Sequence, residues 1–351
     1  MKGGKFNLVK NNSFSSYILQ AVTFVSVVLP LLVFGQSVQN HPDVFRIGTG
    51  GSLGTYFRVG SLIADGINAE QASATQTPAE GTPLVVAQRS NGSVANVRDI
   101  ADGLLESALV QADVASLAYG SDSSELLNIS QTDLMAVASL YLESVHLVVA
   151  TDKGIERIAD LKGKRVSVDE LGSGTQLDVQ FIFDAFEISE ADIKPVYLKS
   201  GDAISRLRNG QLDAFFIVAG YPVSGITELI EEGVGKIVSI DGAGAEKLSE
   251  RYPFFTQSTI PENVYRNTES VNTLAVAALW VLDGSINESV AYQLTASLWS
   301  KDTQNLLKSG HPKGLEITLD SALIGLGIPL HPGAARYYES QNIDTSHLHA
   351  N

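Results

Sequence analysis

Short apolar runs and amphipathic segments alternate along the chain after residue 44. Phe45 and Ile47 alternate with polar residues, as in a half-buried strand, and apolar residues then recur at helical spacing from Tyr56 to Ile67. The same order of strand, small-residue turn and helix returns at Leu84–Leu104 and at Ala108–Tyr119. Alternation of this kind predicts a parallel sheet with helices on both faces.

A second series of strands and helices follows a long apolar segment. This segment runs from Leu134 to Ala150 and is interrupted by the polar stretch Tyr141–Ser144. The second series contains strands predicted at 165–168 and 214–218, and a helix predicted at 177–186. Two series of this kind predict two α/β lobes.

The chain is predicted to return to the first lobe near its C-terminus. Residues 271–282 form a long apolar strand candidate that can cross between the lobes. We therefore predict a lobe 1 formed by residues 36–143 plus 256–351 and a lobe 2 formed by residues 144–255. A chain of this length is too long for one typical hydrophobic core, which agrees with two domains.

The N-terminus has the layout of a secretory signal peptide. Three lysines but no acidic residue precede the apolar stretch Tyr17–Phe34, and the small residue Gly35 follows it. We predict a signal peptide at residues 1–35, cleavage after Gly35 and export to the periplasm. A retained membrane anchor is the alternative interpretation.

Composition narrows the possible partners. The chain has no cysteine, so it can carry neither a disulfide nor a lipid on a cysteine. Removing the three lysines of residues 1–35 from 24 basic and 39 acidic residues leaves a net charge of −18. Such a charge opposes binding to nucleic acid and to anionic lipid. We expect a small-molecule ligand and, as a separate expectation, a monomer.

Small-residue turns stand between the predicted strands and helices. They lie at Gly50–Tyr56, Ser90–Ser93 and Gln111–Asp113 in lobe 1, and at Gly172–Thr175 and Ala219–Tyr221 in lobe 2. Ligands of open α/β sheets bind at the carboxyl ends of the strands, and the first turn of a helix favours carboxylates and phosphates. We therefore predict a cleft between the lobes that binds a small anionic or zwitterionic solute. Ordinary turn and capping residues are the alternative interpretation.

Patterns for cofactors, metals and catalysis are missing from the sequence. A dinucleotide-binding loop requires glycine where Leu53 stands, and no lysine follows Gly172–Thr175 as it would in a P-loop. His146 lies within an apolar run and is interpreted as a core histidine. We predict no cofactor, no metal and no catalytic residue, and therefore no enzyme.

Seven motifs follow one another along the chain, at Ile47–Tyr56, Asn91–Val94, Val110–Val114, Leu161–Val168, Gly172–Thr175, Gly210–Ala214 and Pro329–Ala334. In this order they resemble the TAXI family, which comprises periplasmic receptors of tripartite ATP-independent periplasmic (TRAP) transporters. The resemblance covers nearly all of the chain after residue 35 and implies a type II periplasmic-binding fold whose two lobes close on the ligand. It also implies a small carboxylate or an amino acid such as glutamate or glutamine as ligand, and membrane permease subunits as partners.

Two other classes of function stay open. The first is a periplasmic sensor that feeds a membrane kinase through the same pocket. The second is a hydrolase or an isomerase. The sequence also departs from the family pattern, because Asn91 replaces a small residue and Arg58-Val59 replaces an aromatic-proline pair.

The turns and the resemblance together give a set of predicted ligand-binding residues. Ser173 and Thr175 hydroxyls, with helix-start amides, are expected to hold a carboxylate. Asp113 either accepts from a ligand ammonium or caps its helix at the amides of Ala115 or Ser116. Two tyrosines are either walls of the pocket or core residues. The set is Gly50, Gly51, Ser52, Thr55, Tyr56, Ser90, Asn91, Gln111, Asp113, Tyr141, Ser173, Gly174, Thr175, Ala219 and Gly220.

Overall fold

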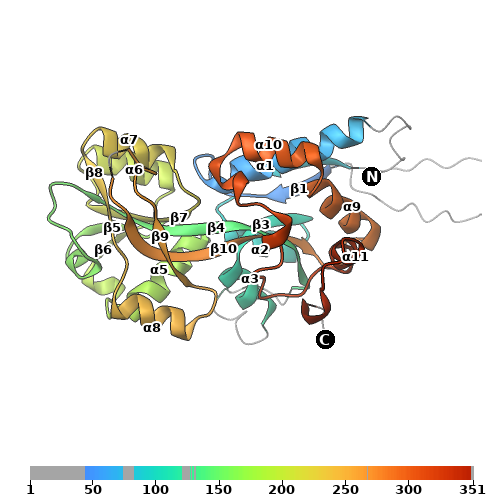
Figure 1. The fold of residues 1–351 in the computed structure, drawn as a ribbon. Helices are drawn as coiled ribbons and strands as arrows, with labels where there is room; N and C mark the ends of the chain where they lie inside the picture. The colour runs from blue at the N-terminus through green and yellow to red at the C-terminus, as the bar shows by residue number, and fades with distance from the viewer. Residues whose placement is uncertain are drawn as a thin grey trace, which may run out of the picture. The chain divides into compact units, whose positions relative to one another are not determined.

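A computed structural model describes residues 44–73, 83–120, 127, 129, 132–266 and 268–348 (Figure 1). The predicted signal peptide at residues 1–35 lies outside these residues. Among the described helices, none is long and apolar enough to cross a membrane.

The described strands form one mixed sheet. Its main path has the order β2-β1-β3-β10-β4-β7-β5-β6, while β8 pairs with β4 and β9 pairs with β10. The strands are β1 Val44–Gly48, β2 Leu84–Gln88, β3 Ser107–Gln111, β4 Leu134–Ala150, β5 Arg165–Ser167, β6 Lys194–Val196, β7 Ala214–Ala219, β8 Gly235–Val238, β9 Thr256–Ile260 and β10 Val271–Asp283.

Helices cover both faces of the sheet at each of its ends (Figure 1). At the β1–β3 end, α1 packs with α9 and α10 on one face, and α2 and α3 cover the other face. At the β5–β7 end, α6 and α7 cover one face, and α5 and α8 cover the other. The helices are α1 Thr55–Ser73, α2 Ser93–Ala101, α3 Ala112–Tyr119, α5 Gly174–Ala185, α6 Ser200–Arg208, α7 Ser224–Glu231, α8 Ala243–Arg251, α9 Glu288–Leu298, α10 Lys301–Gly310 and α11 Pro332–Ser340. Short 3-10 turns are η1 Ile158–Leu161, η2 Glu190–Asp192, η3 Pro312–Leu315, η4 Leu319–Ser321 and η5 Ser346–Leu348.

Two long antiparallel strands join the ends of the sheet. β10 pairs with both β3 and β4, and β4 pairs with β7. The predicted crossing strand near 271–282 is therefore confirmed, as is the two-lobed α/β fold. The lobe boundaries stay a prediction; the one at 143/144 falls inside β4.

Two details of the predicted sheet are wrong. The sheet is not purely parallel, because β4 and β10 are antiparallel to each other and to their neighbours β7 and β3. Tyr141–Ser144 does not interrupt the apolar segment, since β4 continues through it. Here Leu142 is exposed while Leu140, Tyr141, Glu143 and Ser144 are buried, so the polar side chains of this stretch lie inside the fold.

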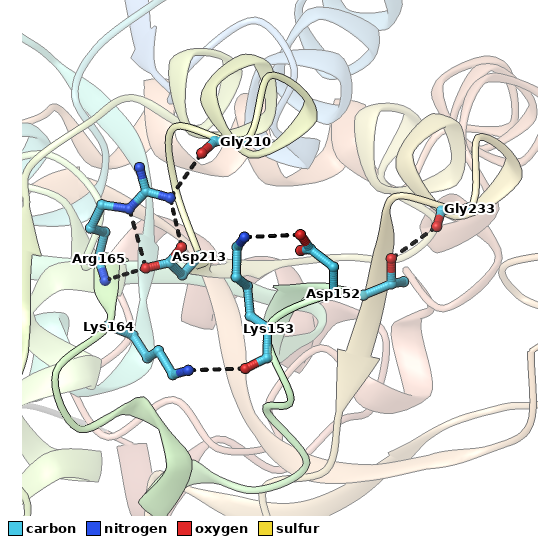
Figure 2. Close-up of polar contacts among 8 residues, drawn as sticks. Asp152, Lys153, Lys164, Arg165, Gly210, Asp213 and Gly233 are labelled. Carbon is cyan, nitrogen blue, oxygen red and sulfur yellow. Dashed lines mark hydrogen bonds and ion pairs between the residues drawn. The ribbon is translucent and has the colours of Figure 1, made fainter.

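The parallel strands at both ends place their carboxyl-end loops toward one site. The opposite edge of β5 and β7 is held by an ion pair between Arg165 and Asp213 (Figure 2). Asp213 accepts from Arg165 Nη2 at 2.7 Å, from Nε at 3.2 Å and from the Arg165 backbone amide at 2.8 Å. Nearby, Lys164 Nζ donates to the Lys153 carbonyl at 2.9 Å. These contacts fix the loops that lead into β5 and β7 without touching the other edge.

Candidate functional site

A cavity of about 90 Å³ lies where the carboxyl-end loops of both halves meet. One water position needs roughly 10–15 Å³ on the same measure, so the cavity has room for a solute of a few heavy atoms. Its walls come from the turns after β1 and β2, the end of β3, the middle of β4, the turn after β5, the start of α6 and the end of β7. The lining residues are Gly50, Gly51, Gly54, Thr55, Tyr56, Asn91, Gly92, Ser93, Gln111, Glu143, Asp169, Glu170, Ser173, Gly174, Thr175, Lys199, Ser200, Ile217, Val218 and Ala219.

Most of the predicted site residues meet at this cavity. Those that line it are Gly50, Gly51, Thr55, Tyr56, Asn91, Gln111, Ser173, Gly174, Thr175 and Ala219. They come from turns that are far apart in the sequence, and the sheet brings them together. Their contact with a ligand stays a prediction.

Five predicted residues lie outside the lining of the cavity. Ser52 is exposed in the turn before α1. Ser90 holds its own turn, because its hydroxyl donates to the Thr49 carbonyl at 2.8 Å and accepts from the Gly92 amide at 3.0 Å. The remaining three, Asp113, Tyr141 and Gly220, are packed behind the wall of the cavity.

The hydroxyl oxygens of Ser173 and Thr175 each accept a hydrogen bond from a backbone amide. Ser173 is the N-cap of α5 and accepts from the Gln176 amide at 3.0 Å. Thr175 Oγ1 accepts from the Val218 amide at 3.0 Å. Each hydroxyl keeps one O–H donor in such an arrangement, and both hydroxyls reach the Asp169 carboxyl in the same wall.

The wall of the cavity contains acidic residues that were not predicted from the sequence, among them the buried Glu143 and the half-buried Asp169. Burial raises the pKa of Glu143 to about 8, although the nearby Tyr56 and Lys313 lower it. Burial likewise raises the pKa of Asp169 to about 7. Glu143 is only 3 % exposed on a strand of apolar neighbours. An acidic residue at a buried strand position is a signal for a functional site, and the sequence did contain it.

Positive charge is sparse in the lining. Lys199 is the one basic residue among the lining residues, and its Nζ lies 3.4 Å from Glu170 Oε2. Lys313, which lies near Glu143, is paired with Glu316 at 2.7 Å and stacks 3.8 Å from the ring centroid of Tyr221. The cavity therefore carries more acidic than basic groups. A purely anionic solute would meet unfavourable charge there, unless the acids are protonated.

Asp113 takes neither of the positions expected for it. The N-cap of α3 is Gln111, and neither carboxyl oxygen of Asp113 accepts a hydrogen bond from a described donor. The helix-capping interpretation is therefore wrong, because Asp113 sits inside the first turn of α3. Asp113 is also fully buried and does not line the cavity. Its neighbour is a second buried carboxyl, Asp178 of α5.

Hydrogen bonds bridge the two halves around the cavity. Thr55 Oγ1 donates to the Gly220 carbonyl at 2.8 Å, and the Ala95 amide donates to the Gly172 carbonyl at 2.9 Å. A third bridge is longer, with Lys199 Nζ 3.3 Å from Asn91 Oδ1. The halves are therefore in contact in this structure. We refer to this arrangement as closed.

Within the described residues, no group of three or more histidines or acidic residues is arranged to hold a metal ion. His146 is fully buried, and its ring nitrogens contact the Ser144 carbonyl and the Tyr265 hydroxyl, each at 2.9 Å. The interpretation of His146 as a core histidine is confirmed.

Comparison with protein families places the chain. The model of a family described as NMT1-like matches residues 47–341. The chain belongs to the NMT1-like family. This match spans every turn that lines the cavity, so the site is part of the family's shared region.

Solved structures resemble this NMT1-like protein at low sequence identity. A protein of Bordetella bronchiseptica RB50 is 14 % identical, with a TM-score of 0.51 over 89 % of this chain and 85 % of that one. The alkanesulfonate-binding protein SsuA of Xanthomonas axonopodis pv. citri, solved with MOPS, is 15 % identical, with a TM-score of 0.43 over 86 % and 94 %. The substrate-binding protein of an amino acid ABC transporter is 13 % identical, with a TM-score of 0.44 over 77 % and 99 %.

Proposed function

We propose that this NMT1-like protein is a periplasmic solute-binding protein that captures a small amino acid and delivers it to a membrane importer. The observation that carries the proposal is the cavity formed by strand-to-helix turns of both halves. A solute that touches both halves binds the closed arrangement better than an open one and so favours closure. The protein performs no reaction on the solute in this proposal.

Hydroxyl and amide donors support a site for the carboxylate of the solute. The hydroxyls of Ser173 and Thr175 lie in the cavity wall beside the first turn of α5, where they now reach the Asp169 carboxyl, and a solute carboxylate would replace Asp169 as their acceptor. The start of a helix carries a partial positive charge that favours a carboxylate. This end of the cavity is proposed to hold the α-carboxylate.

Buried carboxyls support a site for the ammonium group. Glu143 and Asp169 line the cavity, and both have pKa values raised by burial. An ammonium placed between them would restore their ionised forms and would offset the missing positive charge in the wall. Glu143 replaces Asp113 as the proposed ammonium acceptor, because Glu143 faces the cavity.

Calorimetric titration with L-glutamate, L-glutamine and 2-oxoglutarate tests the ammonium site. We expect the two amino acids to bind and 2-oxoglutarate, which lacks the ammonium, to bind at least about tenfold more weakly. Glu143→Gln should weaken amino acid binding by about tenfold or more while leaving 2-oxoglutarate nearly unaffected. Glu170→Gln is the matched control, since Glu170 already lies beside Lys199. Tighter binding of 2-oxoglutarate than of the amino acids would contradict the ammonium site.

The importer is proposed to be a TRAP transporter. The order of motifs that resembles the TAXI family supports it, whereas the solved proteins with ABC in their names share only the fold. A TRAP permease uses an ion gradient, so uptake into proteoliposomes should need this protein and an ion gradient but no ATP. Uptake that depends on ATP would instead assign an ABC importer.

A further inference from the structure

We propose that Asp113 and Asp178 form a proton-binding site across the cleft, so that closure of the two halves takes up one proton. Asp113 belongs to α3 at one end of the sheet, and Asp178 belongs to α5 at the other. The inference rests on the proposed function only in that closure is how the protein holds its solute.

The two carboxyls are buried together with few hydrogen-bond donors. Both residues are fully buried, and their side chains are close enough to hydrogen-bond to each other. Asp178 Oδ1 receives no hydrogen bond from a described donor, and the donors near Asp113 are the backbone amides of Asp113 and Val114, which lie outside good hydrogen-bond geometry. A carboxylate has only acceptors, so two ionised carboxylates cannot hydrogen-bond to each other. One proton shared between them supplies the missing donor.

One donor does reach the pair, and it comes from the cavity wall. Gln111 Nε2 donates to Asp178 Oδ2 at 2.5 Å, and Gln111 is held in turn by Ser93, whose hydroxyl donates to Gln111 Oε1 at 3.2 Å. Gln111 and Ser93 both line the cavity, whereas the carboxyl pair does not. Hydrogen bonds through Gln111 therefore connect the pair to the solute site, but the two carboxyl groups do not themselves reach the cavity.

The surrounding charges favour protonation. Burial is the largest cause that raises the pKa of both carboxyls, and the charge of Asp113 raises that of Asp178 further. Glu143 of β4, when ionised, raises the pKa of Asp178 further. Lys313 acts on Glu143, where it lowers the pKa, and Tyr56 lies on the same side. Two like charges buried side by side cannot both ionise without a large penalty.

Opening the cleft would reverse these conditions. The two carboxyls lie on elements of opposite halves, so separation would expose both to water, where an aspartate titrates near 4. At neutral pH the open form then carries two charges, and the closed form carries one charge and one proton. The ratio of closed to open protein should rise by up to about tenfold for each pH unit of acidification above that value.

Infrared spectroscopy of protein with 13C-labelled aspartate carboxyls tests the site without any solute. The closed form can be trapped by the double variant Ala95→Cys/Gly172→Cys, because the two Cβ atoms would lie 3.8 Å apart, the mean separation in disulfides. The chain has no native cysteine to interfere. At pH 7 the oxidised form should show one more protonated aspartate carboxyl than the reduced form. The comparison is made in the Asp169→Asn background, because the half-buried Asp169 has a pKa of about 7 and would add its own partly protonated carboxyl; Asp178→Asn should remove the signal there.

Either of two results would overturn the proposal: no protonated aspartate gained on locking, or a gain that survives Asp178→Asn. If the disulfide does not form, spin labels at Asp65→Cys and Arg206→Cys, both exposed and in opposite halves, report closure of the unlocked protein. The closed fraction should then rise between pH 8 and pH 5, and Asp178→Asn should make the dependence on pH less steep by about one proton, leaving the part due to Glu143 and Asp169. A closed fraction independent of pH would again overturn it. Neither measurement contains a solute, so a failure of the proposed amino acid binding would leave both results unchanged.

Discussion

Glycine at position 174 decides whether Gln111 can reach across the cleft. A Cβ on residue 174 would lie 1.3 Å from Gln111 Oε1 and 3.0 Å from Ser93 Oγ. Gly174→Ala should therefore displace the Gln111 side chain and break its hydrogen bond to Asp178. A hydrogen bond to a charged group contributes about 1.5–3 kcal/mol, so amino acid affinity measured by calorimetry should fall by roughly tenfold or more.

Gly51→Ala is the matched control for the Gly174→Ala variant. Gly51 also lines the cavity, but a Cβ there would meet no atom within 4 Å. Its thermal unfolding should be unchanged, and its affinity should fall less than that of Gly174→Ala. Equal affinity of Gly174→Ala and the unaltered protein would contradict the role assigned to Gln111.

At the scale of single residues, the sequence predicted the turns better than the contacts they make. Gly50, Ser173 and Thr175 could be placed from their positions after apolar strands, because strand-to-helix turns have a local signature. The contact between Gln111 and Asp178 joins residues 67 apart in sequence. No local pattern encodes such a pair. Glu143 was missed for another reason, since a polar residue inside an apolar run was interpreted as an interruption of the strand.

At the scale of elements, the edge of β5 and β7 opposite the cavity should contribute stability but not binding (Figure 2). Asp213 is 11 % exposed at its side chain and accepts three hydrogen bonds from Arg165. We expect Asp213→Ala to lower the free energy of unfolding in urea by about 1–2 kcal/mol and to leave amino acid affinity unchanged. Asp184→Ala is the control, because its ion pair with Arg251 is exposed and should contribute little.

The stabilisation that the Arg165–Asp213 ion pair provides should decrease on acidification. Arg165 holds the pKa of Asp213 below its usual range, so the pair stabilises the folded state above the unfolded pKa of about 3.9. That stability is lost as the pH falls through the lowered pKa. The difference between Asp213→Ala and the unaltered protein should therefore be full at pH 7 and should shrink near pH 3. A difference that grows on acidification would contradict the ion pair.

Long elements were predictable and short ones were not. α1 buries residues at helical spacing and β10 is a long, continuously apolar run, so their positions were correct within a few residues. The three-residue strand β6 offers too short a pattern to recognise. The antiparallel direction of β4 and β10 could not be predicted from hydrophobic pattern, because buried strands read alike in either direction. It depends on which strands the fold makes neighbours.

At the scale of the whole molecule, solute exchange should require the two halves to separate. The double variant Ala95→Cys/Gly172→Cys places one sulfur in each half at a point where the Ala95 amide already donates to the Gly172 carbonyl at 2.9 Å. When oxidised in the presence of radiolabelled L-glutamate, it should release the label far more slowly than the unaltered protein. Reduction should restore normal release.

The two single cysteine variants distinguish trapping of the solute by the disulfide from the strain that each substitution causes by itself. Gly172 has a φ of 87°, so cysteine there should lower stability by about 1–3 kcal/mol even without a disulfide. Ala95→Cys and Gly172→Cys should each exchange label at nearly the rate of the unaltered protein, since neither can link the halves. Rapid release from the oxidised double variant would mean that the solute leaves without opening of the cleft. Binding would then have to be explained without closure, because the turns of both halves could hold the solute while a path to solvent stays open.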